Sequence, residues 1–332
     1  MFKLPLKVLI GASFDLLFKK KFEGDSYSDY IISKYGKTLY NSFFRDYTEK
    51  FCLIPPEKIH YTWATASVDR AVIDKKVKMD SLFDTIKSTL MPKPVETKFI
   101  YPPKGVYVFS EKLSKLIKNN KGRVITSVKN ISLKKIGNKI SEVVYDGKSI
   151  KTDLLVWTAP INLLSKKLEI QEAKLTYLDT VMYNVMVNKK IDNPNQWIYY
   201  GDNDIFFIRV SIPSNFSKDT VPKRKGGICV EVAVENIGIW NHPEKYLSKL
   251  KEGLEKVELC KKKDIIDIKI EKVKNTYPLY HIDYLKELKK LKLNIERFKN
   301  IICSGRTGNF HYNNMDNSIE EALKLAKEIS GK

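Results

Sequence analysis

The stretch GRTGNFHYNNMDNSIEEALKLA, residues 305–326, decides the fold of this 332-residue chain. The apolar run Asn300–Ser304 directly before it predicts a β-strand, and a helix is expected to begin near Met315. Glycines at the end of a strand let a ligand approach the backbone, and the first amides of a helix attract anionic groups. The stretch therefore predicts a strand, a ligand-binding loop and a helix, although many α/β proteins contain such a unit without a ligand.

The composition indicates a globular protein, because 43% of the residues are hydrophobic, 11% are aromatic and 30% are charged. The formal net charge is +20, and the lysines are scattered along the whole chain. No zinc-ligand spacing, RNA-binding aromatic motif or basic helix with heptads accompanies this charge. We expect a solvated basic surface and no specific nucleic-acid partner.

The four cysteines lie far apart and form no CxxC pair, which predicts reduced thiols, a cytoplasmic location and no metal site: Cys52, Cys229, Cys260 and Cys303. The apolar segment Leu4–Phe18 is too short to span a membrane and contains Lys7 and Asp15. It predicts a partly buried amphipathic helix and leaves peripheral membrane contact open.

Helices are expected over residues 22–100, where apolar residues recur at spacings of three and four, and Pro55–Pro56 should end the first of them. A second amphipathic segment covers Asp80–Leu90. A proline cluster follows and marks the first boundary: Pro92, Pro94, Pro102 and Pro103.

The next region predicts one helix, Phe109–Lys118, and then short strands: Arg123–Ser127, Lys129–Lys135, Ile140–Tyr145 and Leu154–Thr158. The hairpin dipeptides Gly137-Asn138 and Asp146-Gly147 indicate that the middle strands pair antiparallel. Leu154–Trp157 lacks polar alternation, which predicts a strand buried on both faces.

Residues 176–275 are rich in β-branched and aromatic residues, and a helix is expected at Tyr246–Glu258. The predicted strands are Thr180–Val187, Trp197–Tyr200, Ile205–Ile212, Gly227–Val234 and Ile265–Val273. Successive strands of this kind favour an antiparallel sheet, so the fold class is α/β of a mixed α+β type.

Motifs for several kinds of catalysis are missing from the sequence. It contains no GxSxG elbow, no GxxxxGK[ST] loop and no HExxH pair, so it favours neither a serine hydrolase, a P-loop nucleotidase nor a metalloenzyme. Arg306 is suited to a phosphate and equally to an exposed surface. His311, with Phe310 and Tyr312, fits either the flank of a planar ring or simple packing. No catalytic residue is identified.

Residues 305–326, and their NNMD-SI core above all, resemble the C-terminal FAD motif of the protoporphyrinogen oxidase-like, amine oxidase and UDP-galactopyranose mutase superfamily. Further stretches resemble other parts of that superfamily in the expected order, over almost the entire chain: Tyr30–Pro56, Tyr101–Leu116, Arg123–Pro160 and Tyr277–Tyr284.

The resemblance implies an FAD-binding Rossmann-like domain into which a helical cap and an antiparallel substrate sheet are inserted. The expected division is a cap region over 1–100, an FAD-domain segment over 101–165, the substrate sheet over 166–296 and a C-terminal FAD-domain segment over 297–332.

The resemblance also implies positions for FAD contacts. Val128 corresponds to a backbone contact with adenine, and Gly305 and Arg306 lie by the pyrophosphate or ribityl chain. The residues expected to approach the isoalloxazine ring from the helix start are Asn314, Met315, Asp316 and Ser318.

One departure from the superfamily concerns the GxGxxG turn, which the sequence as given does not contain. The amides of that turn hold the pyrophosphate of a dinucleotide. We therefore expect an incomplete FAD domain with poor affinity for FAD, completed by an N-terminal FAD-binding segment on another chain or encoded upstream.

The expected function is an FAD-dependent oxidoreductase like protoporphyrinogen oxidase or amine oxidase, of which this chain is the C-terminal portion. A flavoenzyme acting on a sugar nucleotide, like UDP-galactopyranose mutase, stays open, as does a non-catalytic remnant that serves as an interaction module. The positive charge suits a small anionic substrate. Whether the chain is active alone is left open.

Overall fold

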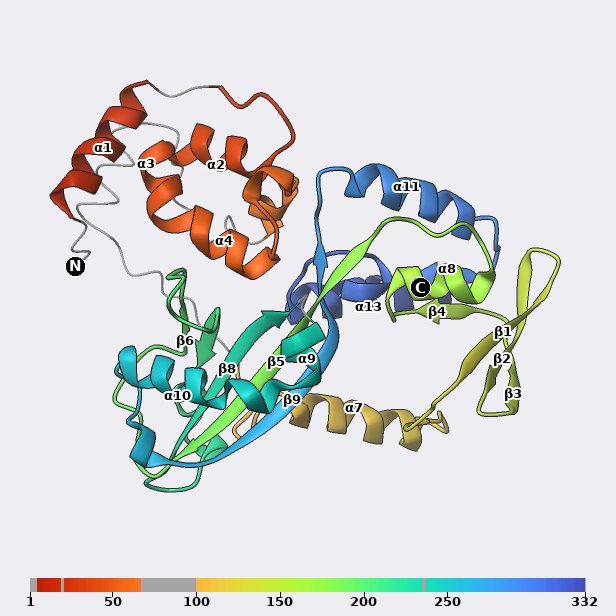
Figure 1. Cartoon of the computed structure of the whole chain (residues 1–332). Helices are drawn as coiled ribbons and strands as arrows, with labels where there is room; N and C mark the ends of the chain where they lie inside the picture. Colours follow the sequence, from red (N-terminus) through yellow and green to blue (C-terminus); the bar gives the residue numbers. More distant parts are fainter. Residues whose placement is uncertain (1–4, 19–20, 67–99, 235–236, 332) are drawn as a thin grey trace. The chain divides into compact units, whose positions relative to one another are not determined.

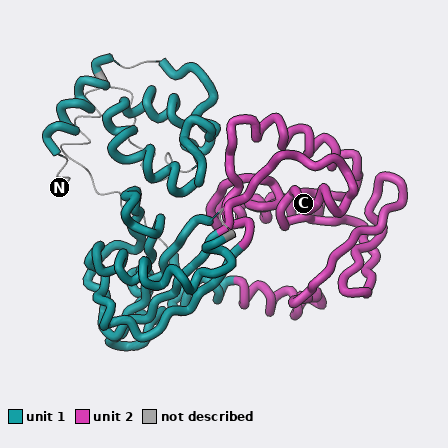
Figure 2. The backbone as a smooth tube through the Cα atoms, viewed as in Figure 1, with its two compact units in different colours: residues 1–109, 180–273 teal, residues 110–179, 274–332 magenta. Residues whose placement is uncertain are grey.

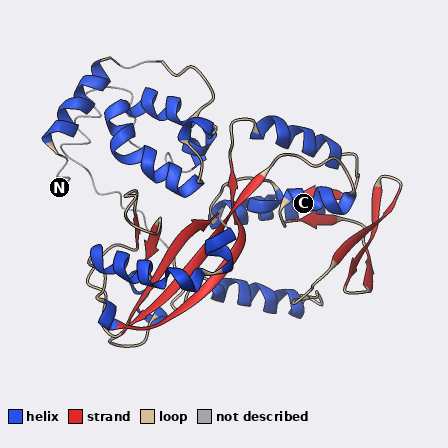
Figure 3. Ribbon diagram, viewed as in Figure 1, coloured by secondary structure: helices blue, strands red, loops and turns tan. Residues whose placement is uncertain are grey.

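The computed structural model describes residues 5–18, 21–66, 100–234 and 237–331. Contacts within the chain form two units, which are drawn in different colours in Figure 2. Unit 1 comprises residues 1–109 and 180–273, and unit 2 comprises residues 110–179 and 274–332. Both units contain helices and strands, which gives the mixed α/β class predicted from the sequence (Figure 3).

The first part of unit 1 is helical, as the sequence predicts. Its elements after α1 (Leu6–Leu17) are α2 (Tyr27–Tyr35), α3 (Lys37–Leu39), the π-helical turn η1 (Tyr40–Phe44) and α4 (Arg45–Cys52). The Ser26 side chain accepts a hydrogen bond from the Asp29 amide and so caps the N-terminus of α2. Helix α4 ends before Pro55–Pro56, which confirms the predicted stop. The segment predicted at residues 80–90, with Pro92 and Pro94, lies outside the described residues.

Helix α1 (Leu6–Leu17) forms within the apolar N-terminal segment. Its inner side contacts helix α3, and Asp15 accepts a hydrogen bond from the Thr38 amide. Large apolar residues on its other face are exposed: Leu6, Ile10, Phe14 and Leu17. Contact of this face with a membrane surface stays a prediction. In the described part of the chain, no helix has the length and hydropathy needed to cross a bilayer.

The second part of unit 1 contains most of a five-stranded sheet with the order β6-β7-β8-β5-β9, in which the first residues of β5 and the last residues of β9 belong to unit 2. The strands are β5 (Thr176–Val187), β6 (Trp197–Tyr199), β7 (Arg209–Ser211), β8 (Gly226–Val234) and β9 (Ile265–Leu279). All five predicted strands form, and β6, β7 and β8 pair antiparallel. The strand expected at Ile205–Ile212 is much shorter than predicted, because only Arg209–Ser211 pairs continuously with neighbours.

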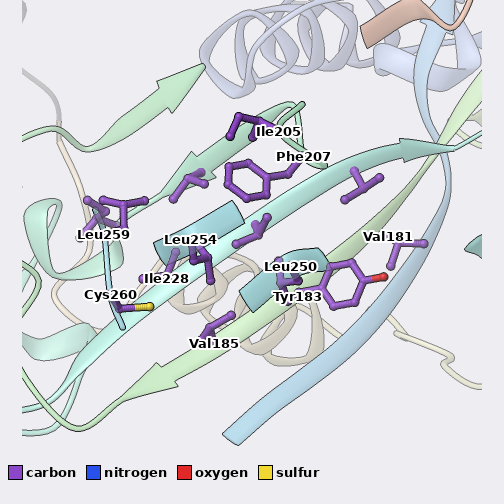
Figure 4. Packing of buried hydrophobic residues seen from close by; sticks show 14 of the residues in the cluster. Val181, Tyr183, Val185, Ile205, Phe207, Ile228, Leu250, Leu254, Leu259 and Cys260 are labelled. Carbon is purple, nitrogen blue, oxygen red and sulfur yellow. The ribbon is translucent and has the colours of Figure 1, made fainter. Parts of the chain in front are cut away.

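The sheet and helix α10 (Leu247–Lys256) enclose the core of unit 1 (Figure 4). Alternate residues of β5, among them Val181, Tyr183 and Val185, point into it. Leu250 and Leu254 lie one turn apart on α10, and both contact the same cluster. The strand at Thr180–Val187 and the helix at Tyr246–Glu258, both predicted from the sequence, thus form this core together.

Lys50 of α4 binds the sheet part of unit 1 through two backbone carbonyls. Its Nζ donates to Tyr200 O at 3.2 Å and to Asp202 O at 2.9 Å. Burial lowers the pKa of Lys50 from 10.5 to about 8, since desolvation opposes the charged form.

The depressed pKa of Lys50 has a predictable effect on stability. Between about pH 8 and 10.5 the unfolded chain holds more protons at this position than the folded chain, so this group's contribution to the free energy of unfolding rises with pH. We expect Lys50→Met to remove that rise, measured as the urea midpoint at pH 7.5 and 9.5, with the exposed Lys58→Met as control. Parallel pH curves for wild type and Lys50→Met would contradict the assignment.

Unit 2 contains two small sheets. Strands β1 (Ile131–Ile136), β2 (Lys139–Tyr145) and β3 (Lys148–Lys151) form an antiparallel ribbon, and both predicted hairpin turns are present. The second sheet pairs β4 (Leu155–Trp157) with β10 (Ile301–Cys303) in parallel. The helices are α7 (Tyr107–Asn119), which begins in unit 1, α8 (Ile161–Leu168), α11 (Tyr284–Ile295), the short α12 (Gly305–Gly308) and α13 (Met315–Ser330). The sequence did not predict β3, α8 or α11.

Two predictions about unit 2 are wrong. Residues 123–127 form no strand, because they pair with no neighbour in the described part of the chain and Ser127 takes a left-handed φ of 61°. Strand β4 and the preceding residue are not buried on both faces, since Leu154 is 37% exposed and Val156 is 39% exposed. In the described residues this sheet has only two strands, and Leu154 and Val156 stay more than a third exposed.

Candidate functional site

Strands β10 and β4 form the platform of the candidate site. Ile301 pairs with Leu155 and Cys303 with Trp157, so the two parallel strands end at the same edge. The Ser304 amide donates to Trp157 O at 3.0 Å and extends the pairing to the first residue of the loop. The predicted strand, loop and helix are therefore confirmed, and β4 positions the loop.

The loop approaches the end of β4 so closely that residue 308 must be glycine. A Cβ atom on Gly308 would lie 2.4 Å from Trp157 O and 3.0 Å from Thr158 Cα. The Thr307 hydroxyl donates to Thr158 O at 2.7 Å, and Thr307 O accepts from the Tyr177 hydroxyl at 2.6 Å. The loop backbone is thus held on both sides.

Phe310 anchors the other end of the loop in an aromatic cluster. It is buried and takes a positive φ of 52°, which reverses the chain direction after α12. Its ring packs edge-on against Tyr177, with 5.0 Å between centroids, and lies beside Tyr280 and Tyr284. The Tyr280 hydroxyl also accepts a hydrogen bond from the Tyr312 amide, with 2.7 Å between nitrogen and oxygen. Phe310 therefore serves packing, one of the two interpretations allowed by the sequence.

Arg306 lies between two tyrosine rings. Its Cζ is 5.2 Å from the ring centroid of Tyr277 and 4.7 Å from that of Tyr312, distances at which a guanidinium is attracted to the aromatic face. Its Nε is buried and has no hydrogen-bond partner among the described residues. A buried donor without an acceptor is costly, so the geometry fits an anion or a carbonyl group of a ligand at this position.

The first turn of α13 follows the loop and carries the other predicted contacts. Asn314 precedes the helix, and its side chain makes no capping hydrogen bond. Met315 and Asp316 are exposed. The Ser318 hydroxyl instead donates to the buried Asn313 side chain at 3.1 Å, and Asn313 Nδ2 lies 3.4 Å from Glu321 Oε1.

Val128 lies in a different part of unit 2. It precedes β1, and the Asp146 carboxylate accepts the amides of the next two residues, Lys129 and Asn130. Asp146 belongs to the turn between β2 and β3, so the ribbon holds this segment in place. The structure thus places Gly305, Arg306 and the start of α13 on one continuous loop and Val128 at the base of the ribbon. Contact of any of these residues with FAD stays a prediction.

Neither a reactive cysteine nor a metal-binding cluster lies beside this loop among the described residues. Burial raises the pKa of the Cys303 thiol to about 11, which opposes formation of a reactive thiolate. The residues described in the structure include no cluster of three His, Cys, Asp or Glu side chains that would hold a metal ion.

The sequence did not identify Tyr277 and Tyr312 as the residues that enclose Arg306. Tyr277 ends the long strand β9, so its approach to the loop depends on tertiary structure. The available signal was weak: Tyr312 lies six residues after Arg306 in the same segment, and Tyr277 stands in the tyrosine-rich stretch Tyr277–Tyr284.

Comparisons with known proteins identify the fold. No protein-family model matches the chain, and no curated protein matches its sequence. Among solved structures, a reduced UDP-galactopyranose mutase is similar, with a TM-score of 0.80 and 16% identity over 99% of this chain and 74% of that chain.

Two other solved structures are similar at lower scores. A protoporphyrinogen oxidase-like protein from Exiguobacterium sp. 255-15 has a TM-score of 0.70 and 13% identity over 96% of this chain and 72% of that one. A putrescine oxidase variant has a TM-score of 0.61 and 12% identity over 100% of this chain and 77% of that one. The names of these three proteins are those of the enzymes that residues 305–326 resemble, and this chain has their fold.

Proposed function

We propose that this chain is the C-terminal portion of an FAD-dependent oxidoreductase of the protoporphyrinogen oxidase and amine oxidase kind. The observation that carries the proposal is Arg306, held between Tyr277 and Tyr312 with an unsatisfied buried Nε. It lies at the carboxyl end of a parallel strand, where α/β folds bind their ligands.

The residues of the loop fit part of an FAD site. The Arg306 guanidinium supplies fixed donors for the pyrophosphate, and Gly305 has open space where a Cβ atom would be, so a ligand can approach its backbone. The exposed first turn of α13 offers amides to the electron-rich edge of a ring. The flavin itself, when bound, supplies the redox chemistry, and the chain contributes position and charge.

The proposal is tested by comparing FAD with riboflavin, which lacks the pyrophosphate. We expect the chain to bind FAD about tenfold more tightly than riboflavin, since a charge-assisted hydrogen bond contributes about 1.5–3 kcal/mol. Arg306→Ala should remove this difference, whereas Arg306→Lys, which keeps the charge without the fork of donors, should retain part of it. The measurement is flavin fluorescence at equilibrium, with circular dichroism to confirm folding.

Equal affinity of the wild type for FAD and riboflavin would contradict the assignment of Arg306 to the pyrophosphate. Loss of all flavin binding, both alone and with a polypeptide that carries the GxGxxG turn, would favour the non-catalytic interaction module.

A second candidate is a flavoenzyme that acts on a sugar nucleotide. It is favoured by the TM-score of 0.80 to the UDP-galactopyranose mutase and by the net charge of +20, which suits a diphosphate substrate. Protection of unit 1 from hydrogen exchange by a nucleoside diphosphate sugar, and none by an amine, would select this candidate.

A further inference from the structure

One end of the five-stranded sheet of unit 1 carries three basic segments. Residues 188–190 follow β5, residues 222–225 precede β8, and residues 261–263 lie shortly before β9. Their sequences are NKK, PKRK and KKK. Because β8, β5 and β9 are neighbours in the sheet, the end of β5 and the beginnings of β8 and β9 lie together (Figure 1). The tertiary structure thus gathers basic runs that are far apart in the sequence.

Contacts between the segments hold them side by side. The Asn188 amide donates to Asp264 O at 2.8 Å, so the residues after β5 lie beside those before β9. The Lys225 side chain donates to the Asn188 side chain. A Cβ atom on Gly226 would lie 2.5 Å from Lys189 O, so the residues before β8 lie on the other side of β5. We call the surface formed by residues 188–190, 222–225 and 261–263 the basic end of the sheet.

The basic end contains eight cations, of which seven are lysines, and all except Lys225 are exposed. Asp264 pairs with Lys189 at 3.0 Å, and Glu252 lies 3.6 Å from Lys262. Repulsion among the remaining like charges falls when an anionic partner binds them. The exposed cations that form no ion pair with any described residue are Lys190, Lys223, Arg224, Lys261 and Lys263.

The residue types of the basic end indicate the kind of anion. Its three segments contain no aromatic residue, and proteins that bind single-stranded nucleic acid stack the bases on aromatic rings. Lysine is depleted in protein–protein interfaces, and arginine predominates where a phosphate is recognised with fixed geometry. A cluster of about four to eight lysines and arginines is typical instead of a surface that binds anionic phospholipids.

Two apolar side chains accompany these charges. Ile266 is the second residue of β9 and is 53% exposed, and Met186 is the last residue but one of β5 and is 47% exposed. Both lie at the strand ends that carry the basic segments. A soluble polyanion gains nothing from exposed apolar side chains, whereas a membrane interface buries them at the boundary of headgroups and acyl chains.

We infer that the basic end of the sheet docks on an anionic phospholipid membrane. The lysines of the three segments contact the headgroups, and Ile266 and Met186 enter the interface between them. This surface is separate from the apolar face of α1 and contains none of the residues of the candidate site. The inference therefore goes beyond the proposed function and does not rest on flavin chemistry.

Binding of the full chain to vesicles tests the inference. We expect the wild type to sediment with vesicles of phosphatidylcholine and phosphatidylserine at about 0.1 M salt, and not with phosphatidylcholine alone or at about 1 M salt. The variant Lys190→Ser/Lys223→Ser/Lys261→Ser removes one unpaired cation from each segment. It should bind at least about twentyfold more weakly, since one lysine near an anionic surface contributes roughly fivefold. Circular dichroism shows whether the variant is folded.

The matched control removes three exposed lysines elsewhere, Lys58→Ser/Lys139→Ser/Lys148→Ser, and so loses the same charge. We expect its binding to stay within about twofold of wild type, because the attraction falls off within a Debye length. Equal loss in both triple variants would mean that the net charge of +20 attracts the vesicles, and this would overturn the inference. Failure of the wild type to bind the anionic vesicles, or its retention on duplex DNA in preference to them, would do the same.

A single substitution, Ile266→Ser, separates a membrane from a soluble polyanion. It should weaken vesicle binding about threefold or more, because less apolar surface enters the interface, and leave elution from heparin unchanged. An Ile266→Ser variant that binds vesicles as the wild type does would overturn the inference, because charge alone would then account for the binding. No flavin is added in these experiments, so their failure is distinguishable from failure of the proposed function.

Discussion

Replacing Glu231 with alanine is expected to lower the free energy of unfolding of unit 1 by about 2–4 kcal/mol. Arg209 of β7 and Glu231 of β8 are directly opposite in the register, and they form two parallel hydrogen bonds. Arg209 Nε is 2.8 Å from Oε1 and Nη2 is 2.7 Å from Oε2. The Glu231 side chain is 9% exposed and that of Arg209 is 25% exposed, so removal of the carboxylate costs more than at an open surface.

The control for this prediction is the double variant Arg209→Met/Glu231→Leu. Apolar residues of similar volume remove both charges at once, and such replacements of buried pairs are often neutral. We expect the double variant to lie within about 1 kcal/mol of wild type. Urea unfolding of both variants measures the difference. A double variant as unstable as Glu231→Ala would show that the loss comes from packing and not from an unpaired charge.

Local signals in the sequence were sufficient for most elements of the fold. The hairpin at Gly137-Asn138, the strand before Gly305 and helix α13 each depend on residues close together in the chain. The five strands of the large sheet were recognised because β-branched and aromatic residues are enriched in them. The superfamily resemblance, confirmed at the level of the fold, adds their order in the chain.

Failures occurred where an element depends on a partner. Val124 and Ile125 favour a strand, but a strand forms only where another edge satisfies its backbone. Val156 was expected to be buried because it is apolar. Its burial, however, requires a second layer of structure over the sheet, which local sequence does not reveal. Helix α11 was missed because its many lysines hide the apolar positions Tyr284, Leu291 and Ile295, which are buried.

The site shows the same division between local and tertiary information. Gly305 and Arg306 were identified from the motif, and Gly305 has the positive φ that favours glycine. The sequence gives no means of placing Tyr277 beside Arg306, because the two residues come together only when β9 and the loop after β10 are both folded.

Gly308→Ala is expected to destabilise unit 2 by about 2–3 kcal/mol. The added methyl group would lie 2.4 Å from Trp157 O and 3.0 Å from Thr158 Cα, which are backbone atoms held by the pairing of β4 with β10. Relief of the overlap requires the loop to move away from the strand, and this movement lengthens the hydrogen bond from Thr307 to Thr158 O.

Gly305→Ala is the matched control, three residues earlier in the same loop. Its Cβ would have nothing within 4 Å, but the backbone has a φ of 75°, so only the conformational cost of about 1 kcal/mol is expected. Hydrogen exchange of residues 155–160 distinguishes the two variants, because only Gly308→Ala should accelerate exchange at the end of β4. Equal acceleration in both variants would mean that backbone conformation, and not the close approach to Trp157, fixes the loop. The two variants also differ in their expected effect on Arg306. A loop that moves away from β4 carries the Arg306 guanidinium away from Tyr277, whereas a strained loop that stays in contact with β4 does not.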